Sequence, residues 1–139
     1  MKKNTSITEI MTTNFKTVGA NELLNVAEDI LFSNQFKHLP VIKNGKLVGI
    51  ISKTDIKRMS FADEFGTSEF EADQEVFKML TVSQVMINKP FTLNIEATIK
   101  DVAVILSQKE FRSIPIMDKE EVVGIVTTKD LIKYLLTLL

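Results

Sequence analysis

The sequence contains one stretch that occurs twice, and this internal repeat constrains the fold more than any other feature. Residues 40–57 read PVIKNGKLVGIISKTDIK, and residues 115–133 read PIMDKEEVVGIVTTKDLIK. Both copies have a proline, a β-rich run with Val-Gly-Ile, a hydroxyl residue and then an aspartate. The aligned pairs, each separated by 75 residues, are Pro40/Pro115, Gly49/Gly124, Ser52/Thr127 and Asp55/Asp130.

The same offset continues towards the N-terminus and needs no gap from residue 6 to residue 56. Because an internal repeat defines the architecture, it is considered before any single motif. Two copies are too few for an open solenoid, whose stability comes from stacking several units. The sequence therefore predicts a pair of similar units that bury apolar faces against each other.

Composition narrows the class of protein. A chain of 139 residues suits one compact domain or two small units, and 45% hydrophobic with 25% charged residues is ordinary for a soluble globular protein. The net charge of −1 provides no basic field for nucleic acid or anionic lipid. The absence of cysteine excludes disulfides, thiolate catalysis and cysteine-ligated zinc. No apolar run resembles a signal peptide or a membrane span, so we expect a cytoplasmic protein.

Each copy reads as β-α-β-β-α, which is an α+β pattern. In the first copy an apolar stripe at helical spacing precedes strands 39–42 and 47–51. The Asn44-Gly45 pair between these strands predicts a tight hairpin, because its turn needs positive φ at both central residues. The second copy has no glycine between Asp118 and Glu121, so a wider loop is predicted there. Helices are expected over residues 56–65 and from residue 131 to the C-terminus.

Two further segments carry local signals. Ser6-Ile-Thr-Glu9 and, at the repeat offset, Thr81-Val-Ser-Gln84 have the capping-box pattern, which predicts a short helical turn at each. Residues 60–80 have no counterpart in the repeat, and we expect two helical pieces there, separated at Gly66, with another capping box at Ser68–Glu71. The phenylalanines of this segment either cover the core or form a partner-binding stripe, and their helical spacing favours the core; they are Phe61, Phe65, Phe70 and Phe77.

The stretch from Gly49 to Asp55 is the best candidate for ligand chemistry. A buried strand ends there and a helix begins, so free backbone N–H groups and the positive helix dipole favour anions. The Asp55 carboxylate can accept two hydrogen bonds from a vicinal diol such as a ribose. In the alternative interpretation, Ser52 is a helix N-cap and Asp55 only complements the dipole. Thr127 and Asp130 repeat the arrangement, and the residues alone leave both interpretations open.

The ordered set of these motifs resembles a tandem pair of cystathionine-β-synthase-like (CBS) domains, known as a Bateman module. The resemblance covers nearly all of residues 6–135. It rests on Lys16-Thr-Val18 and Phe91-Thr-Leu93, on the approach Phe-basic-x-x-Pro, on the hairpin, and on the run Gly-apolar-apolar-Ser/Thr-x-x-Asp. It implies two repeats related by a pseudo-two-fold axis, with repeat 1 at residues 1–65, a helical linker at 66–80 and repeat 2 at 81–139.

The resemblance also implies ligands and residue roles. Members of the family bind AMP, ADP, ATP or S-adenosylmethionine between the repeats, as regulatory ligands rather than required cofactors. The residues expected to hold ribose or phosphate are Ser52, Thr54, Asp55, Thr127, Asp130, Lys37, His38 and Arg112. The residues expected to line the adenine pockets are Thr17, Val18, Ile50, Thr92, Leu93 and Ile125. The copies differ, since Lys37-His38 corresponds to Arg112-Ser113 and Thr54 to Lys129.

Three functions are compatible with this sequence. The leading hypothesis is a non-catalytic sensor that binds an adenosine-containing ligand and signals through conformation or assembly, as a homodimer or through a regulated protein in trans. The second is an interaction or dimerisation module whose clefts stay empty. An enzyme is disfavoured, because the sequence shows no acid–base pair, metal set or phosphate loop. The only histidine, His38, lacks a partnered nucleophile. Neither nucleic acid nor a membrane is expected as a partner.

Overall fold

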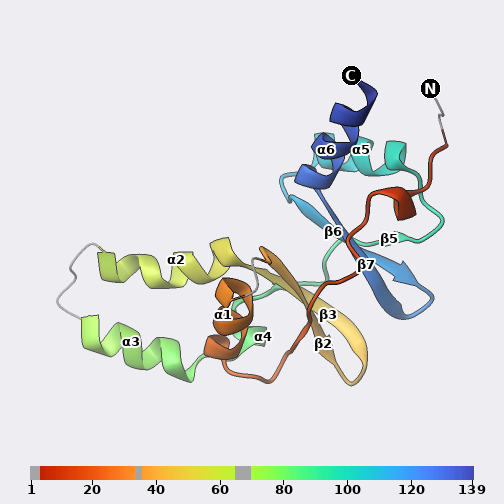
Figure 1. Cartoon of the computed structure of the whole chain (residues 1–139). Coiled ribbons are helices and arrows are strands. Elements are labelled where there is room, and N and C mark those ends of the chain that lie inside the picture. The colour runs from red at the N-terminus through yellow and green to blue at the C-terminus, as the bar shows by residue number, and fades with distance from the viewer. Residues whose placement is uncertain (1–3, 34–35, 65–69) are drawn as a thin grey trace. The chain divides into compact units, whose positions relative to one another are not determined.

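The computed structural model describes residues 4–33, 36–64 and 70–139, with the backbone alone for residues 60–64 and 70–74 (Figure 1). The chain divides into two compact units. One consists of Lys16–Pro90, and the other consists of Met1–Phe15 together with Phe91–Leu139. We call them the first-repeat unit and the second-repeat unit, after the hairpin that each contains. The predicted linker break at Gly66 and the predicted capping box at Ser68 lie outside the described residues.

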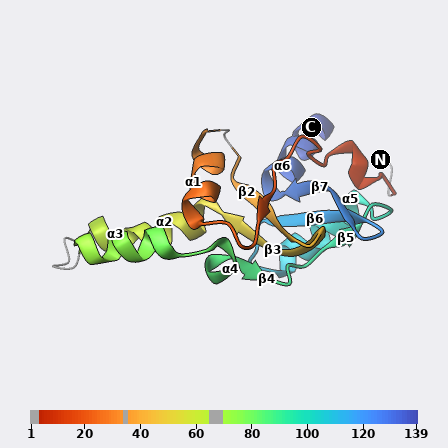
Figure 2. The same cartoon turned by 90° about the horizontal axis from the view of Figure 1, so that it is seen from below.

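The first-repeat unit has a four-stranded sheet in the order β1-β2-β3-β4. Strand β1 is Val18–Gly19, β2 is His38–Lys43, β3 is Lys46–Ser52 and β4 is Ile87–Asn88. Strand β1 pairs in parallel with β2, and the other neighbours are antiparallel. The helices are α1 (Leu24–Ser33), α2 (Lys53–Glu64), α3 (Phe70–Met79) and α4 (Val82–Val85). Helices α2 and α3 lie side by side (Figures 1 and 2).

The second-repeat unit repeats this plan with fewer elements. Its three-stranded sheet has the order β5-β6-β7, with β5 at Leu93–Asn94, β6 at Ser113–Asp118 and β7 at Glu121–Thr127. A 3-10 turn, η1, spans Ile7–Glu9, and two helices, α5 at Ile99–Gln108 and α6 at Thr128–Leu138, complete the unit. The irregularity in β2/β3 between Val41 and Ile42 recurs in β6/β7 between Ile116 and Met117. The repeat thus extends to the details of strand register.

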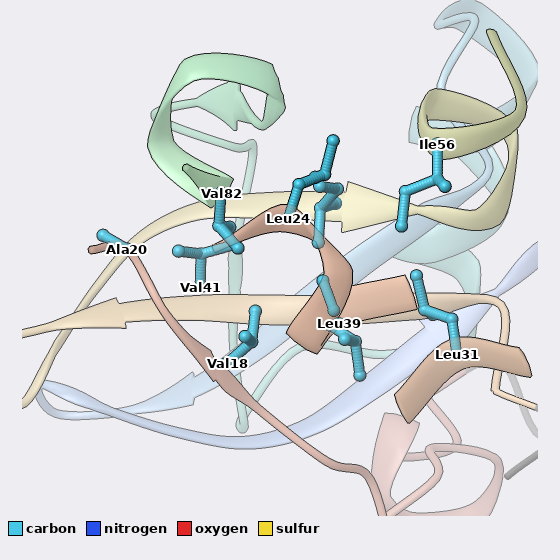
Figure 3. Packing of buried hydrophobic residues seen from close by; sticks show 10 residues of the cluster. Val18, Ala20, Leu24, Leu31, Leu39, Val41, Ile56 and Val82 are labelled. Atoms are coloured by element: carbon cyan, nitrogen blue, oxygen red, sulfur yellow. The ribbon is translucent and has the colours of Figure 1, made fainter. Parts of the chain in front are cut away.

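Each sheet buries one face under its helices. In the first-repeat unit the core joins sheet residues such as Val18, Leu39 and Val41 to Leu24 and Leu31 of α1 (Figure 3). In the second-repeat unit the core consists of Ile7, Val102, Ile114, Ile116 and Val126. Phe77 of α3 packs against the first-repeat core, which confirms the core interpretation for that phenylalanine. The side chains of the other three lie outside the described residues.

The segments that begin the two repeats are exchanged between the units. Ile7 is fully buried in the second-repeat core, whereas Val82, its counterpart at the 75-residue offset, is fully buried in the first-repeat core. Thr12 bridges to Ile125 of β7, and Ile87 pairs with Ile50 of β3. The packing units therefore do not coincide with residues 1–65 and 81–139. Those ranges describe where each repeat begins and ends in the sequence, and they stay a prediction.

The glycines of Val-Gly-Ile provide the space for these exchanged segments. A Cβ added to Gly49 would collide with the Met86 sulfur and would lie 2.9 Å from the Ile87 carbonyl oxygen. At Gly124 the corresponding atoms are the Met11 sulfur at 2.7 Å and the Thr12 carbonyl oxygen at 3.2 Å. A glycine in a strand can also mark a place where a ligand approaches the backbone closely. In the structure a methionine of the same unit occupies this space.

The hairpins are two-residue turns in both repeats. Asn44 and Gly45 have φ of 52° and 77°, as the Asn-Gly signal predicts. The wider loop expected in the second repeat was wrong, because Asp118 pairs directly with Glu121 and Lys119 takes a φ of 58° without a glycine. Helices α2 and α6 begin at Lys53 and Thr128, three residues earlier than expected, because Ser52 and Thr127 cap them.

Candidate functional site

The predicted site residues of each repeat lie within a single unit, so the two half-sites are described separately. Both are built where the second long strand of the hairpin ends and a helix of more than eight residues begins. Strand β3 ends at Ser52 and α2 begins at Lys53, while β7 ends at Thr127 and α6 begins at Thr128. The hydroxyl residue and the aspartate are therefore fixed by the strand-to-helix junction.

Side-chain alternation places most of the predicted site residues at the strands on the sheet face opposite the core. His38 lies across from Ser52, and Pro40 lies across from Ile50. Val18 of β1 pairs with Val41 in a parallel register, so Thr17, one residue earlier, lies beside Pro40. Since neighbouring residues across a sheet share a face, Thr17, His38, Ile50 and Ser52 face the same side. In the second-repeat unit the corresponding residues are Thr92, Ser113, Ile125 and Thr127.

Val18 and Leu93 were predicted to line the adenine pockets, but the structure places them on the other face. Val18 is buried in the first-repeat core, and Leu93 packs against the second-repeat core. Each is one residue away from Thr17 or Thr92 along the strand, and adjacent strand residues point to opposite faces. The structure therefore separates these two side chains from the rest of the predicted set.

Ser52 and Asp55 form a reciprocal capping box in the first-repeat unit. The Ser52 N–H donates to Asp55 Oδ2 at 2.9 Å, and the Asp55 N–H donates to Ser52 Oγ at 3.1 Å. Arg58, which is largely exposed, places a guanidinium nitrogen 3.9 Å from Asp55 Oδ1. The sequence did not single out Arg58, although its i+3 spacing from Asp55 on a helix is a recognisable signal.

Thr127 and Asp130 form the same box in the second-repeat unit. The Thr127 N–H donates to Asp130 Oδ2 at 2.9 Å, and the Asp130 N–H donates to Thr127 Oγ1 at 3.1 Å. In both boxes the backbone bond engages Oδ2, and a carboxylate has about four lone-pair sites in total. The capping role and the diol-binding role, which the sequence presented as alternatives, are therefore chemically compatible.

The basic residues are held beside these helix starts by backbone bonds. The Lys53 N–H donates to the Lys37 carbonyl at 3.0 Å, and the Thr128 N–H donates to the Arg112 carbonyl at 2.9 Å. Both basic side chains are exposed, as are Thr54 and Lys129 at the second helical position. In the part of the chain that the structure describes, the N–H groups of Thr54 and Lys129 have no acceptor. Each half-site thus combines a cation with an unused donor at a helix N-terminus, which suits an anion.

The two half-sites differ in their titratable groups. Burial lowers the pKa of His38, the Asp55 carboxylate opposes this shift, and Lys37 reinforces it. The corresponding residue of the second-repeat unit is Ser113, a buried side chain that does not titrate at these pH values. Ser113 was not among the predicted contacts, although its alignment with His38 at the repeat offset was a sufficient signal. Of these two corresponding residues, His38 is thus the titratable one.

Comparisons with known proteins agree with this repeated arrangement. The model of the CBS domain matches residues 7–61 and again residues 82–137. The chain therefore belongs to the CBS domain family, and it carries two copies of the domain. Proteins built on such pairs are generally regulatory rather than catalytic. No helix in the described ranges is long and apolar enough to cross a membrane.

Curated relatives match nearly the whole chain but differ in length. The chain is 29% identical to protein MJ1404 of Methanocaldococcus jannaschii over 96% of its own length and 32% of that protein. It spans 24% of homoserine O-acetyltransferase from Methanococcus vannielii, at 26% identity over 90% of its own length. It spans 82% of the CBS domain-containing protein YhcV of Bacillus subtilis, at 27% identity over 91% of its own length. The chain thus spans less than a third of the first two relatives.

Two solved structures show the same architecture. The CBS domain pair of protein MJ0100, in complex with 5′-methylthioadenosine and S-adenosyl-L-methionine, has a TM-score of 0.76 at 26% identity, covering 94% of this chain and 99% of that one. CBSX2 of Arabidopsis thaliana, in complex with AMP, has a TM-score of 0.78 at 22% identity, covering 96% of this chain and 98% of that one. The second likeness concerns the fold alone.

Proposed function

We propose that this protein is a non-catalytic sensor whose two half-sites bind adenosine-containing ligands. The observation that carries the proposal is the capped helix start with a half-buried aspartate, which occurs twice in a chain of the CBS domain family. The ligand changes the conformation or the assembly of the protein by binding one state more tightly than another. The sensor acts in the cytoplasm as a homodimer or on a protein in trans.

The proposed contacts follow from the two faces of each sheet. Asp55 and Asp130 hold ribose hydroxyls through the oxygen that the capping box leaves unused. Phosphate or another polar group lies against the helix N-terminus, where the contacts are Ser52, Thr54, Lys37 and His38 in one half-site and Thr127 and Arg112 in the other. The adenine ring contacts the sheet face at Thr17 and Ile50, or at Thr92 and Ile125. Val18 and Leu93 support this face from the core side.

The complex of protein MJ0100 supports an adenosyl ligand, because that CBS pair is 26% identical over nearly the whole chain and binds two such compounds. The basic residues Lys37 and Arg112 suit a phosphate, so AMP, ADP and ATP are candidates alongside S-adenosylmethionine. A ligand with phosphates should gain more from these cations than a ligand that carries a sulfonium. The two classes are therefore distinguishable by the effect of removing Arg112.

The second candidate function is an interaction module whose half-sites stay empty. One observation favours it: each aspartate already accepts a backbone hydrogen bond within its own capping box. A helix cap needs no ligand to explain its presence. In this case dimerisation or partner binding would not respond to any nucleotide.

Thermal unfolding with a ligand panel tests the proposal. The panel contains AMP, ADP, ATP, S-adenosylmethionine and NAD, each with and without Mg²⁺. A ligand at about 100 times its Kd adds about 2.7 kcal/mol, which raises the Tm of a domain of this size by several degrees. A selective rise for one adenosine compound supports the sensor. If no compound raises the Tm at millimolar concentrations, the interaction module is favoured.

Asparagine variants separate ligand binding from helix capping. Asp55→Asn keeps an oxygen that can accept the Ser52 N–H but removes the charge and one acceptor for a diol. We expect about a tenfold or larger loss of affinity at one half-site, with stability close to wild type. Asp130→Asn should affect the other half-site, and Asp101→Asn is the matched control, because Asp101 forms a similar box with Thr98 at the start of α5. Wild-type affinity in both site variants would argue against ribose binding by these residues.

A further inference from the structure

Helix α3 exposes apolar side chains on the side away from the core. Phe77 packs against the first-repeat core, whereas Val76 is 55% exposed and Met79 is 74% exposed. Val76 and Met79 are three positions apart, so they lie on one side of the helix. Leu23, which is 45% exposed, is bridged to Thr81, two residues beyond Met79. We call Leu23, Val76 and Met79 the α3 face, because apolar residues that gather on one surface mark an interaction site.

The α3 face is not part of the repeat plan. Helix α3 belongs to residues 60–80, which have no counterpart in the repeat, and it packs against α1 and α2 (Figures 1 and 2). At the 75-residue offset Leu23 corresponds to Thr98, whose hydroxyl oxygen caps α5. A helix that only covers the core is polar on its outer side. The outer apolar side of α3 therefore indicates a contact outside this unit.

Acidic residues flank the α3 face. Six of the 18 acidic residues of the chain fall within residues 61–77, which contain no lysine or arginine. On α3 the acidic positions are 71, 73 and 75, and the Glu75 side chain is exposed. Helical periodicity places positions 73 and 75 on opposite flanks of the row formed by positions 72, 76 and 79. Lys78 is the one basic residue of the helix, so an apolar row lies between acidic flanks.

This charge pattern selects the class of occupant. An apolar row with acidic flanks is complementary to an amphipathic helix whose own apolar row is flanked by lysine or arginine. The α3 of a second copy would bring acidic flanks against acidic flanks, which is repulsive. The phosphates of nucleic acid and of anionic lipids are repelled for the same reason.

We propose that the α3 face binds a basic amphipathic helix of a partner protein. Val76 and Met79 contact the apolar row of that helix, and Glu75 pairs with a flanking lysine or arginine. The apolar residues provide most of the affinity, whereas the charges at the rim provide association rate and specificity. The inference deepens the proposed function, and it rests on that proposal for the existence of a regulated protein in trans.

A synthetic helix serves as the probe. It is a fluorescent peptide of about three heptads, with leucine along one side and lysine on both flanks. Fluorescence anisotropy measures its binding to the full chain, and the matched peptide carries glutamate in place of every lysine. We expect a micromolar Kd for the lysine peptide and a Kd at least about tenfold higher for the glutamate peptide.

Val76→Glu separates the apolar contact from simple charge attraction. The change removes the centre of the apolar row and adds a negative charge, so attraction between charges alone would make this variant bind the lysine peptide more tightly. We expect instead a Kd at least about tenfold higher than wild type. Met79→Glu should act alike, and it replaces Val76→Glu if that variant loses its helical circular dichroism. Val104→Glu on α5, where Val104 is 43% exposed, is the control and should not raise the Kd.

Charge reversal tests the acidic flank. Glu75→Lys should raise the Kd of the lysine peptide about three- to tenfold, because it replaces an attraction with a repulsion. Glu96→Lys makes the same change in net charge at an exposed position of the second-repeat unit, and it should have a smaller effect. Added salt should weaken wild-type binding more than Glu75→Lys binding, since the variant has lost a screened charge pair.

Four results would overturn the proposal: no binding of the lysine peptide at about 0.1 mM, equal binding of both peptides, a Val76→Glu Kd no higher than wild type, or equal effects of Glu75→Lys and Glu96→Lys. Analytical ultracentrifugation adds a fifth, because weaker self-association of Val76→Glu would assign the α3 face to a second copy of this chain.

The ligand panel, run on the same samples, keeps the two proposals separate. Peptide binding that depends on Val76, with no Tm response to any nucleotide, would support the α3 face and argue against the sensor. A Tm response to a nucleotide without peptide binding would support the sensor and overturn the α3 face.

Discussion

Thr12 and Ile125 exchange two backbone hydrogen bonds across the second-repeat unit. The Thr12 N–H donates to the Ile125 carbonyl at 2.8 Å, and the Ile125 N–H donates to the Thr12 carbonyl at 3.0 Å. The N-terminal segment is thereby attached to β7, which comes from the far end of the sequence. The five residues before this bridge include Ile7, which is buried in the second-repeat core, and Ile10 and Met11, which pack against that core.

Ile7→Ala should destabilise the second-repeat unit although the residue lies near the N-terminus. Its side chain is fully buried, and truncating a buried isoleucine costs about 2–5 kcal/mol. Hydrogen exchange should show the largest loss of protection in β6, β7 and α5. Glu9→Ala, at an exposed position of the same turn, should change little. Greater loss of protection in β2 and β3 would contradict the exchanged arrangement.

Gly49→Ala should destabilise the protein by about 1–3 kcal/mol, because the new methyl group has no space. The added Met86→Ala change removes the flexible neighbour but leaves the Ile87 carbonyl oxygen 2.9 Å away, so stability should recover only in part. At Gly124 the backbone oxygen is at 3.2 Å, and Gly124→Ala with Met11→Ala should recover more. Urea unfolding of the four variants checks this order. Equal recovery at both glycines would show that the backbone contact is unimportant.

Asp55→Ala should cost about 0.5–2 kcal/mol, the usual value for losing a helix N-terminal cap. The loss arises because the Ser52 N–H then lacks its carboxylate acceptor. Asp130→Ala should behave alike, since its box has the same geometry. Chemical denaturation without ligand measures the effect. Arg58→Ala is a useful control, because the Arg58 side chain is largely exposed and its 3.9 Å contact with Asp55 should contribute little.

The pH dependence of stability should reveal His38. Burial holds the pKa of His38 below its usual value of 6.5, so the unfolded chain binds a proton more readily than the folded chain. Stability should therefore be complete above about pH 6.5 and should fall as the pH drops through the lowered pKa of the folded state. Comparing urea midpoints at neutral and mildly acidic pH tests this expectation.

The control for this measurement comes from the repeat itself. His38→Gln should reduce the loss of stability at acidic pH, because it removes the imidazole that titrates. Ser113→Ala, at the corresponding position of the second repeat, should leave the decline unchanged. An identical decline in His38→Gln and wild type would assign the effect to the carboxylates rather than to the histidine.

The repeat and the hairpins were predictable because their signals are local. Asn44-Gly45 specifies its turn, and strand alternation sets the register between β2 and β3. The second turn was not predictable in the same way. Lys119 adopts a left-handed conformation that costs an ordinary residue about 1–2 kcal/mol, and the repeated strand pairing around it maintains that conformation.

The local geometry of the candidate site was predictable, but the sheet face of every side chain was not. The hydroxyl residue and aspartate of each repeat meet as the spacing suggests, and backbone bonds place Lys37 and Arg112 beside them. Val18 and Leu93 could not be assigned from the family pattern alone, since their face depends on the strand register. The exchange of segments was not predictable either, because Ile7 and Val82 occupy the same place in the repeat, and the repeat alone does not indicate which core each residue joins.

The exchanged segments affect where the chain can be cut. A fragment that ends at the linker, such as residues 1–65, would carry Ile7 without the core that buries it, and would leave the space at Gly49 without Met86. A fragment of residues 16–90 would keep the complete set of strands and helices of one unit. Cloning boundaries for half-molecules, and any shuffling of repeats between relatives, should therefore follow the packing units rather than the apparent start of each repeat.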